Sequence, residues 1–282
     1  LEAGVHFGHL RKKWNPKMLP YIFAEKKGIH IIDLNKTVEG LQEAAAAMKA
    51  IARSGKKIMF VATKKQAKEL VTECAQRVNM PYVTERWLGG MLTNFNTVRK
   101  SVKKMQSIEK LLNDGSAESL NKKEKLTLSR EKEKMEKVLG GIAQISRIPA
   151  ALFLIDIGHE HIALAEAKKL GINTFGMVDS NCDPNKVDFA IPSNDDATKS
   201  IAIITNYITA AIAEGLQERQ SSKDDEEQHE VEESAAARAS RFEQKDAEGD
   251  DKGKRSRSSG GTGGTKRRFP SAGGGGRKPA AK

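Results

Sequence analysis

Short apolar runs alternate with amphipathic segments along most of this chain, and that alternation restricts the fold more than any other feature. Runs of this length suit buried strands, and the segments between them show the three- and four-residue spacing of helices. Strands separated by helices pair in parallel, so five or so of them predict a doubly wound sheet. We expect an α/β fold, Rossmann- or flavodoxin-like, with helices on both faces. The expected strands lie at 28–34, 56–62, 81–84, 150–156, 172–179 and 189–191.

A different period interrupts the alternation between the third and fourth expected strands. Apolar residues recur at helical spacing from Val98 to Leu112 and again from Leu120 to Ile142, on either side of a turn signal at 113–116. Two such narrow stripes predict antiparallel helices in a coiled-coil hairpin at 99–145. The hairpin would be an insertion in a discontinuous α/β domain, 29–98 and 146–219, that follows a basic N-terminal arm at 1–28.

The last part of the chain, 220–282, has too few apolar residues to build a core. Residues 223–251 include twelve acidic and four basic residues, whereas 252–282 include ten basic residues and no acidic one. This composition predicts a disordered tail, acidic and then basic. Such a tail can bind RNA or an anionic membrane, fold back on the chain, or only keep it soluble.

The charge balance favours an anionic partner. The chain carries a formal net charge of +11, which suits nucleic acid. Its two cysteines form neither a disulfide framework nor a metal-ligand cluster, so we expect a reducing, cytoplasmic compartment. No apolar run approaches the roughly 18 residues of a membrane span. A nucleotide-binding enzyme is the weaker alternative, because no glycine fingerprint, Walker loop or nucleophile–base pair follows a strand.

The candidate RNA-binding residues are cations and flat rings in three stretches. In the arm, cations neutralise phosphates and Trp14 stacks on a base, although the arm's aromatics can instead pack on the domain. After the second strand, two lysines open a helix and can meet phosphate there. The third stretch joins a turn at 84–97 to the hairpin base, where no acid occurs between Glu85 and Glu109. The candidates are Arg11, Lys12, Lys13, Trp14, Lys17, Lys64, Lys65, Arg86, Trp87, Arg99, Lys100, Lys103 and Lys104.

Carboxylates near the ends of the later strands are candidates for a cation site. Asp179, Asp183, Asp195 and Asp196 carry the oxygen ligands that a hard cation such as Mg²⁺ prefers. His159 and His161 are two positions apart and do not share a helix face, so they do not predict a zinc site. We expect no other cofactor.

Six blocks of sequence, in unbroken order, resemble the bacterial S2 family of small-subunit ribosomal proteins. Together they extend over residues 1 to about 215, and six separate matches make the resemblance highly specific. The blocks are 3–9 (AGVHFGH), 14–18 (WNPKM), 30–34 (HIIDL), 86–95 (RWLGGMLTNF), 139–142 (LGGI) and 188–196 (DFAIPSNDD).

The resemblance implies a Rossmann-like domain with an inserted coiled-coil hairpin, docked on small-subunit rRNA between the head and body of the particle. It also implies contacts with neighbouring small-subunit proteins, among them ribosomal protein S1, which draws mRNA to the platform. Proteins of this family are not catalytic and use no nucleotide. The tail from about Gln220 is longer and more basic at its end than is usual in the family, so its role does not carry over.

Overall fold

The computed structural model describes residues 1–113, 121–222 and 224. The turn signal at 113–116 and the tail expected at 220–282 lie largely outside the described residues. Within them, no helix is long and apolar enough to cross a membrane.

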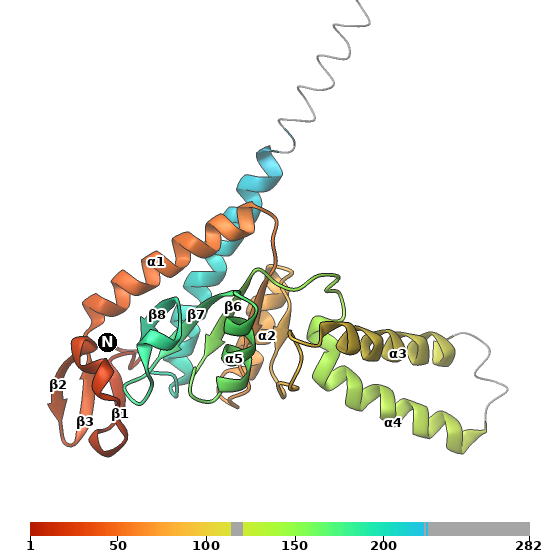
Figure 1. Ribbon diagram of the computed structural model, residues 1–282, viewed down its shortest axis with the longest axis horizontal. Coiled ribbons are helices and arrows are strands. Elements are labelled where there is room, and N and C mark those ends of the chain that lie inside the picture. The colour runs from red at the N-terminus through yellow and green to blue at the C-terminus, as the bar shows by residue number, and fades with distance from the viewer. Residues whose placement is uncertain (114–120, 223, 225–282) are drawn as a thin grey trace, which may run out of the picture. The chain divides into compact units, whose positions relative to one another are not determined.

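A five-stranded parallel sheet forms the centre of the fold (Figure 1). Its strands are β4 (Ile58–Val61), β5 (Tyr82–Val83), β6 (Ala151–Ile155), β7 (Asn173–Val178) and β8 (Phe189–Pro192). They lie in the order β5-β4-β6-β7-β8, and every neighbouring pair is parallel. This is the flavodoxin-like order, in which the chain changes direction between β4 and β6. The predicted doubly wound fold is confirmed.

Successive side chains of the central strands point to opposite faces, and each face has its own core. On one face, Phe60, Phe153 and Phe175 pack under α1 (Leu34–Arg53), α2 (Lys68–Arg77) and the C-terminal helix, 198–222. On the other, Met59 and Leu152 pack under α5 (His161–Lys169) and the base of the hairpin. Both faces are therefore buried, which explains why the strands read as continuous apolar runs.

The first 32 residues form a second, antiparallel sheet. Strands β1 (Phe7–Leu10), β2 (Ile22–Lys26) and β3 (Ile29–Ile32) pair in the order β1-β3-β2. The expectation that 28–34 belongs to the parallel sheet is therefore wrong, and the basic N-terminal arm expected at 1–28 supplies two strands of the antiparallel sheet. Lys27 and Gly28 both have positive φ, +53° and +76°, and make a tight turn that returns β3 against β2. A two-residue turn is enough for antiparallel pairing, whereas a parallel partner needs a crossover connection.

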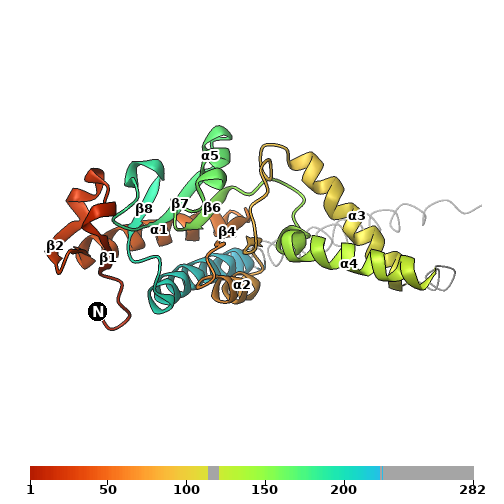
Figure 2. The same cartoon turned by 90° about the horizontal axis from the view of Figure 1, so that it is seen from below.

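The coiled-coil hairpin is confirmed. Helices α3 (Phe95–Asn113) and α4 (Lys122–Leu139) lie side by side in both views (Figures 1 and 2). Val102, Met105 and Ile108 are buried along the seam of α3. Ion pairs from Lys104 to Glu131 and from Lys132 to Glu109 join the two helices. The hairpin returns to the sheet through η4 (Gly140–Ile142), which leads toward β6.

Candidate RNA-binding and cation-binding sites

One buried carboxylate fixes the turn that leads into the hairpin. Glu166 of α5 accepts hydrogen bonds from the backbone N–H groups of Gly90, Leu92 and Thr93 at 2.7, 3.0 and 3.0 Å. It also accepts from the Thr93 hydroxyl at 3.1 Å and from the Trp87 indole at 3.2 Å. Five donors from four residues converge on one side chain, so the path of the turn is tightly determined.

The same contacts correct the RNA-binding role predicted for Trp87, as a flat ring on which a base could stack. Its side chain belongs to the core beneath α5, and the residue is only 7% exposed. A ring held between core side chains and hydrogen-bonded to Glu166 presents no face to an RNA base. Arg86 and Trp87 are neighbours in the sequence, and the pattern did not reveal that Arg86 is exposed whereas Trp87 is buried.

The hydrogen bonds also set the acidity of Glu166. Burial by itself would raise the pKa of this carboxyl, because it penalises the charged form. The backbone hydrogen bonds from Thr93, Gly90 and Leu92 favour the carboxylate and outweigh burial, so the pKa lies below its ordinary value. Glu166 is ionised at neutral pH, and the turn depends on that charge.

The hairpin base carries a group of free cations, which we call the α3 patch: Arg86, Arg99, Lys100 and Lys103. All four side chains are exposed, and none forms an ion pair within residues 1–113 and 121–222. Arg99 and Lys103 are four residues apart on α3 and therefore share one face. The nearby Glu85 is neutralised by Lys68 at 2.8 Å. The α3 patch can therefore neutralise phosphates without breaking an existing contact.

The remaining cation of the hairpin base has a partner already. Lys104 is exposed but pairs with Glu131 of α4, so it links the two helices. A surface pair of this kind contributes little to stability and does not prevent an RNA contact. It makes Lys104 a weaker candidate than the α3 patch.

The predicted cations of the N-terminal region divide in the same way. Lys12 and Lys13, in η1 (Arg11–Lys13), are exposed and form no ion pair in the described part of the chain. Arg11 pairs with Glu25 at 3.3 Å, and Lys17, in η2 (Pro16–Tyr21), pairs with Asp183 at 2.6 Å. Of these four cations, only Lys12 and Lys13 can bind a ligand without breaking an ion pair.

Trp14, next to these cations, is half-buried. Its ring centroid lies 5.1 Å from that of the buried His30, with the planes inclined by 40°. One side of the ring thus covers the antiparallel sheet, as the packing alternative for the arm's aromatics proposed. A stacking role for the remaining surface of the ring stays a prediction.

The N-terminal cations and the α3 patch do not form one surface. The antiparallel sheet and the hairpin lie at opposite ends of the parallel sheet in both views (Figures 1 and 2). Strand β5, at one edge, neighbours η4, whereas β8, at the other, packs against α1. Lys65 is exposed near the carboxyl end of β4, between these regions. The predicted residues therefore offer separate contact points for an extended partner.

Lys64 is not a free cation, which corrects its predicted role with phosphate. Its ammonium lies 2.7 Å from Asp156, 2.8 Å from Asp195 and 2.8 Å from Asp196. Burial would lower its pKa, but the Asp195 charge and the three hydrogen bonds outweigh burial and raise it. These groups follow the carboxyl ends of β4, β6 and β8, where open α/β sheets bind ligands. At this end of the sheet, the ion pairs of Lys64 with the three aspartates fill the position where a ligand would bind in other open α/β sheets.

A candidate metal site adjoins Lys64. One ring nitrogen of His9 and one carboxylate oxygen each of Asp179 and Asp195 lie within 4.8 Å of one another. His9 Nδ1 is 2.8 Å from Asp179, a contact that raises the pKa of the imidazole. Asp195 is fully buried, and its Oδ2 has no hydrogen-bond partner. Burial and the charges of Asp156 and Asp179 raise the pKa of Asp195 to about 7 and outweigh the opposing effect of Lys64.

The metal candidates therefore change in part. Asp179 and Asp195 belong to this site, and Asp196 borders it through His9 Nε2 at 3.4 Å. Asp183 does not, because it caps η5 (Pro184–Lys186) and pairs with Lys17. An imidazole nitrogen beside two carboxylates suits Zn²⁺ better than Mg²⁺. His9 lies 170 positions from Asp179, so no local pattern in the sequence indicated that it joins the carboxylates.

Gly8 allows His9 to reach the carboxylates. A Cβ at this position would lie 2.8 Å from Ser180 Oγ and 3.1 Å from Asp179 Oδ1. The close approach also lets the His9 backbone N–H donate to Ser180 Oγ at 2.7 Å. Position 8 therefore requires glycine, because only a residue without a side chain can lie this close to the loop that follows β7.

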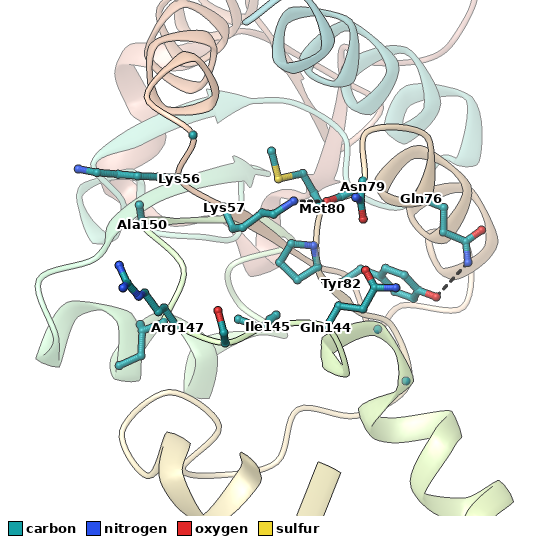
Figure 3. Close-up of a pocket in the computed structure, with 16 residues that line it drawn as sticks. Lys56, Lys57, Gln76, Asn79, Met80, Tyr82, Gln144, Ile145, Arg147 and Ala150 are labelled. Carbon is teal, nitrogen blue, oxygen red and sulfur yellow. Dashed lines mark hydrogen bonds between the residues drawn. The ribbon is translucent and has the colours of Figure 1, made fainter. Parts of the chain in front are cut away.

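A pocket of about 960 Å³ opens at the other end of the strands, where β4, β5 and β6 begin (Figure 3). One wall is the connection from the hairpin to β6, and the other contains the end of α2 and the residues before β4 and β5. Sequence reasoning did not single it out, because its lining comes from three separate stretches.

Comparison of the sequence with known proteins identifies a family for this chain. The family described as Ribosomal protein S2 matches residues 1–215. A protein of Cytophaga hutchinsonii named small ribosomal subunit protein uS2 is 66% identical over 224 residues, which is 79% of this chain and 88% of the relative. A protein of the same name from Bacteroides thetaiotaomicron is 61% identical over 223 residues, 79% of this chain and 80% of the relative.

The lowered pKa of Glu166 makes its contribution to stability dependent on pH. We expect Glu166→Gln to lower the free energy of unfolding at pH 7 by about 2 kcal/mol, the value of charge-assisted hydrogen bonds. The difference from the wild type should shrink as pH falls through and below the ordinary glutamate range, because the wild-type carboxylate then becomes protonated. Urea unfolding from pH 7 down to about pH 3 measures this, with the exposed Glu69→Gln as control. A difference that stays constant with pH would contradict it.

The site at His9, Asp179 and Asp195 predicts stabilisation by Zn²⁺. With the full chain freed of metal, we expect one zinc ion per chain to raise the unfolding temperature, and Asp195→Asn to abolish that rise. At a free zinc concentration 100 times Kd, the gain is about 2.7 kcal/mol. Asp183→Asn, outside the site, should respond as the wild type does. An equal rise in Asp195→Asn would place any bound zinc elsewhere.

Proposed function

The chain belongs to the ribosomal protein S2 family, and from that premise we propose that it binds small-subunit rRNA where the head of the particle meets the body. Members of this family are structural components of the small ribosomal subunit, so the chain is a structural protein of translation and not an enzyme. The chain is located in the small ribosomal subunit, in the bacterial cytoplasm, where it associates with the rRNA and proteins of that particle.

The α3 patch is the observation that best supports rRNA binding. Its four cations are exposed and unpaired among residues 1–113 and 121–222, and the buried Glu166 fixes the turn that carries them. Cations on a rigid element lose little freedom when they contact phosphates, and counterions released from the RNA favour the complex. Lys12, Lys13 and Lys65 supply further contacts away from the hairpin.

We also propose that the chain contributes to holding ribosomal protein S1, and through it mRNA, on the small subunit. The exposed apolar side chains of the antiparallel sheet and η2 support a protein contact there. Phe23 is 77% exposed, and Phe7, Leu10 and Leu19 are also exposed. Exposed apolar side chains in one small region are groups that a partner protein can cover.

The α3 patch predicts a specific change in salt dependence. In the full chain, we expect Arg99→Gln, Lys100→Gln and Lys103→Gln together to weaken binding to small-subunit rRNA. The slope of log affinity against log salt should fall by about 2 to 3, since each phosphate contact contributes about 0.9. Fluorescence anisotropy with labelled rRNA at several salt concentrations gives both quantities.

Three lysines away from the α3 patch give a matched control with the same change in charge. Lys168, Lys169 and Lys199 are exposed, and their replacement by glutamine should leave the slope nearly unchanged. Equal losses in the two triple variants would mean that net charge alone, and not the α3 patch, governs binding.

The apolar surface of the antiparallel sheet is tested in intact particles. We expect small subunits that contain Phe23→Ser to retain the chain but to lose ribosomal protein S1, with a binding deficit of roughly 1–2 kcal/mol, as for an interface anchor. Ile203→Ser, at an exposed position of the C-terminal helix, is the control. Sedimentation and quantitative mass spectrometry measure both proteins. Unchanged S1 content in the Phe23 variant would exclude this surface as its anchor.

A further inference from the structure

The pocket at the amino ends of β4, β5 and β6 has the chemistry of a nucleotide site. None of the sixteen residues that line it is acidic, and three of them are cations: Lys56, Lys57 and Arg147. All three are exposed and form no ion pair in the described ranges 1–113 and 121–222. A pocket lined by cations without a neutralising carboxylate favours an anionic ligand.

A hydrogen bond and the pairing of two strands fix the positions of these cations. Lys57 donates to the Asn79 carbonyl at 2.6 Å, which holds its ammonium against the pocket wall. Lys56 and Arg147 lie on one side of the pocket in Figure 3. They come from positions just before β4 and β6, so the parallel pairing of those strands determines their separation. This arrangement can hold successive phosphates of one strand.

Neutral polar groups occupy the opposite side. Gln76, Tyr82 and Gln144 lie across the pocket from Lys56 and Arg147 (Figure 3). Gln76 Nε2 donates to the Tyr82 hydroxyl at 3.1 Å, which leaves the Gln76 carbonyl free to accept and the Tyr82 hydroxyl free to donate. Gln144 is exposed and supplies a second amide. Amides and a phenol that offer both donors and acceptors match the edge of a base.

We propose that this pocket binds a nucleotide of a single-stranded rRNA segment, with phosphates at Lys56, Lys57 and Arg147 and the base edge at Gln76 and Gln144. The volume of about 960 Å³ is at the upper end of the range typical of ligand pockets, so an unstacked nucleotide can enter. A base inside a duplex cannot reach such a recess. The inference rests on the proposed rRNA binding and adds a second contact, separate from the α3 patch, that selects unpaired RNA.

The test compares single-stranded and double-stranded RNA with the full chain. The probes are a fluorescent oligoribonucleotide of about ten unpaired nucleotides and a duplex of the same length. Lys56→Gln, Lys57→Gln and Arg147→Gln together should weaken single-strand binding and lower its salt slope by about 2, at roughly 0.7 per phosphate. Duplex binding should stay unchanged, and circular dichroism checks that the variant is folded.

The triple variant of Arg99, Lys100 and Lys103 distinguishes failure of the pocket inference from failure of the proposed rRNA binding. If it weakens RNA binding while the pocket variant binds single strands normally, the pocket inference fails and the proposed function stands. If neither variant changes binding, both fail. If the pocket variant weakens single-strand and duplex binding equally, the pocket is a general cationic surface and not a nucleotide site.

Two further measurements address the ligand class. Gln144→Ala should lower single-strand affinity several-fold at an unchanged salt slope, since it removes a base contact and no charge; unchanged affinity would remove Gln144 from the site. A polyglutamate peptide of the same charge as the oligoribonucleotide should compete weakly. Competition as strong as that of unlabelled RNA would assign the pocket to acidic peptides and overturn the proposal.

Discussion

The position of the coiled-coil hairpin relative to the parallel sheet depends on the hydrogen bonds that the buried carboxylate of Glu166 accepts. It belongs to α5, yet its partners lie in the turn that leads into α3, 73 to 79 positions earlier. Leaving those buried backbone donors unpaired would cost more free energy than the hydrogen bonds contribute net, because the donors would lose water without gaining a partner. The turn therefore has one favourable path, and it sets where the hairpin leaves the sheet and where the cations of its base point.

The chain uses its cations in two distinct ways. Lys64 lies among three carboxylates at the carboxyl end of the sheet, where separating the charges would leave them uncompensated in a poorly hydrated place. The cations at the hairpin base are exposed, and water screens them until a polyanion arrives. The 48 basic residues therefore overstate the number of cations available for recognition, because some of them are paired with carboxylates inside the fold.

The sequence predicts the features that repeat locally and fails where distant segments meet. Strand and helix periods located the parallel sheet and the hairpin, since both patterns recur within a few residues. Trp87 and Lys64 looked like surface groups beside other cations, but Glu166 and Asp195, far along the chain, bury or neutralise them. Asp156, Asp179 and Asp195 follow parallel strands, which was the available signal that they converge; nothing local indicated that His9 joins them.

The contact between Gly8, His9 and the loop at Asp179–Ser180 has a consequence for synthesis on the ribosome. Strands β2 and β3 of the antiparallel sheet pair through a two-residue turn and can form early, but the loop after β7 that His9 contacts is made about 170 residues later. Contacts of such long sequence separation slow folding. This N-terminal region therefore leaves the exit tunnel long before its docking surface is made, and until then Val5 and Met18, which pack into the two cores, are open to chaperones.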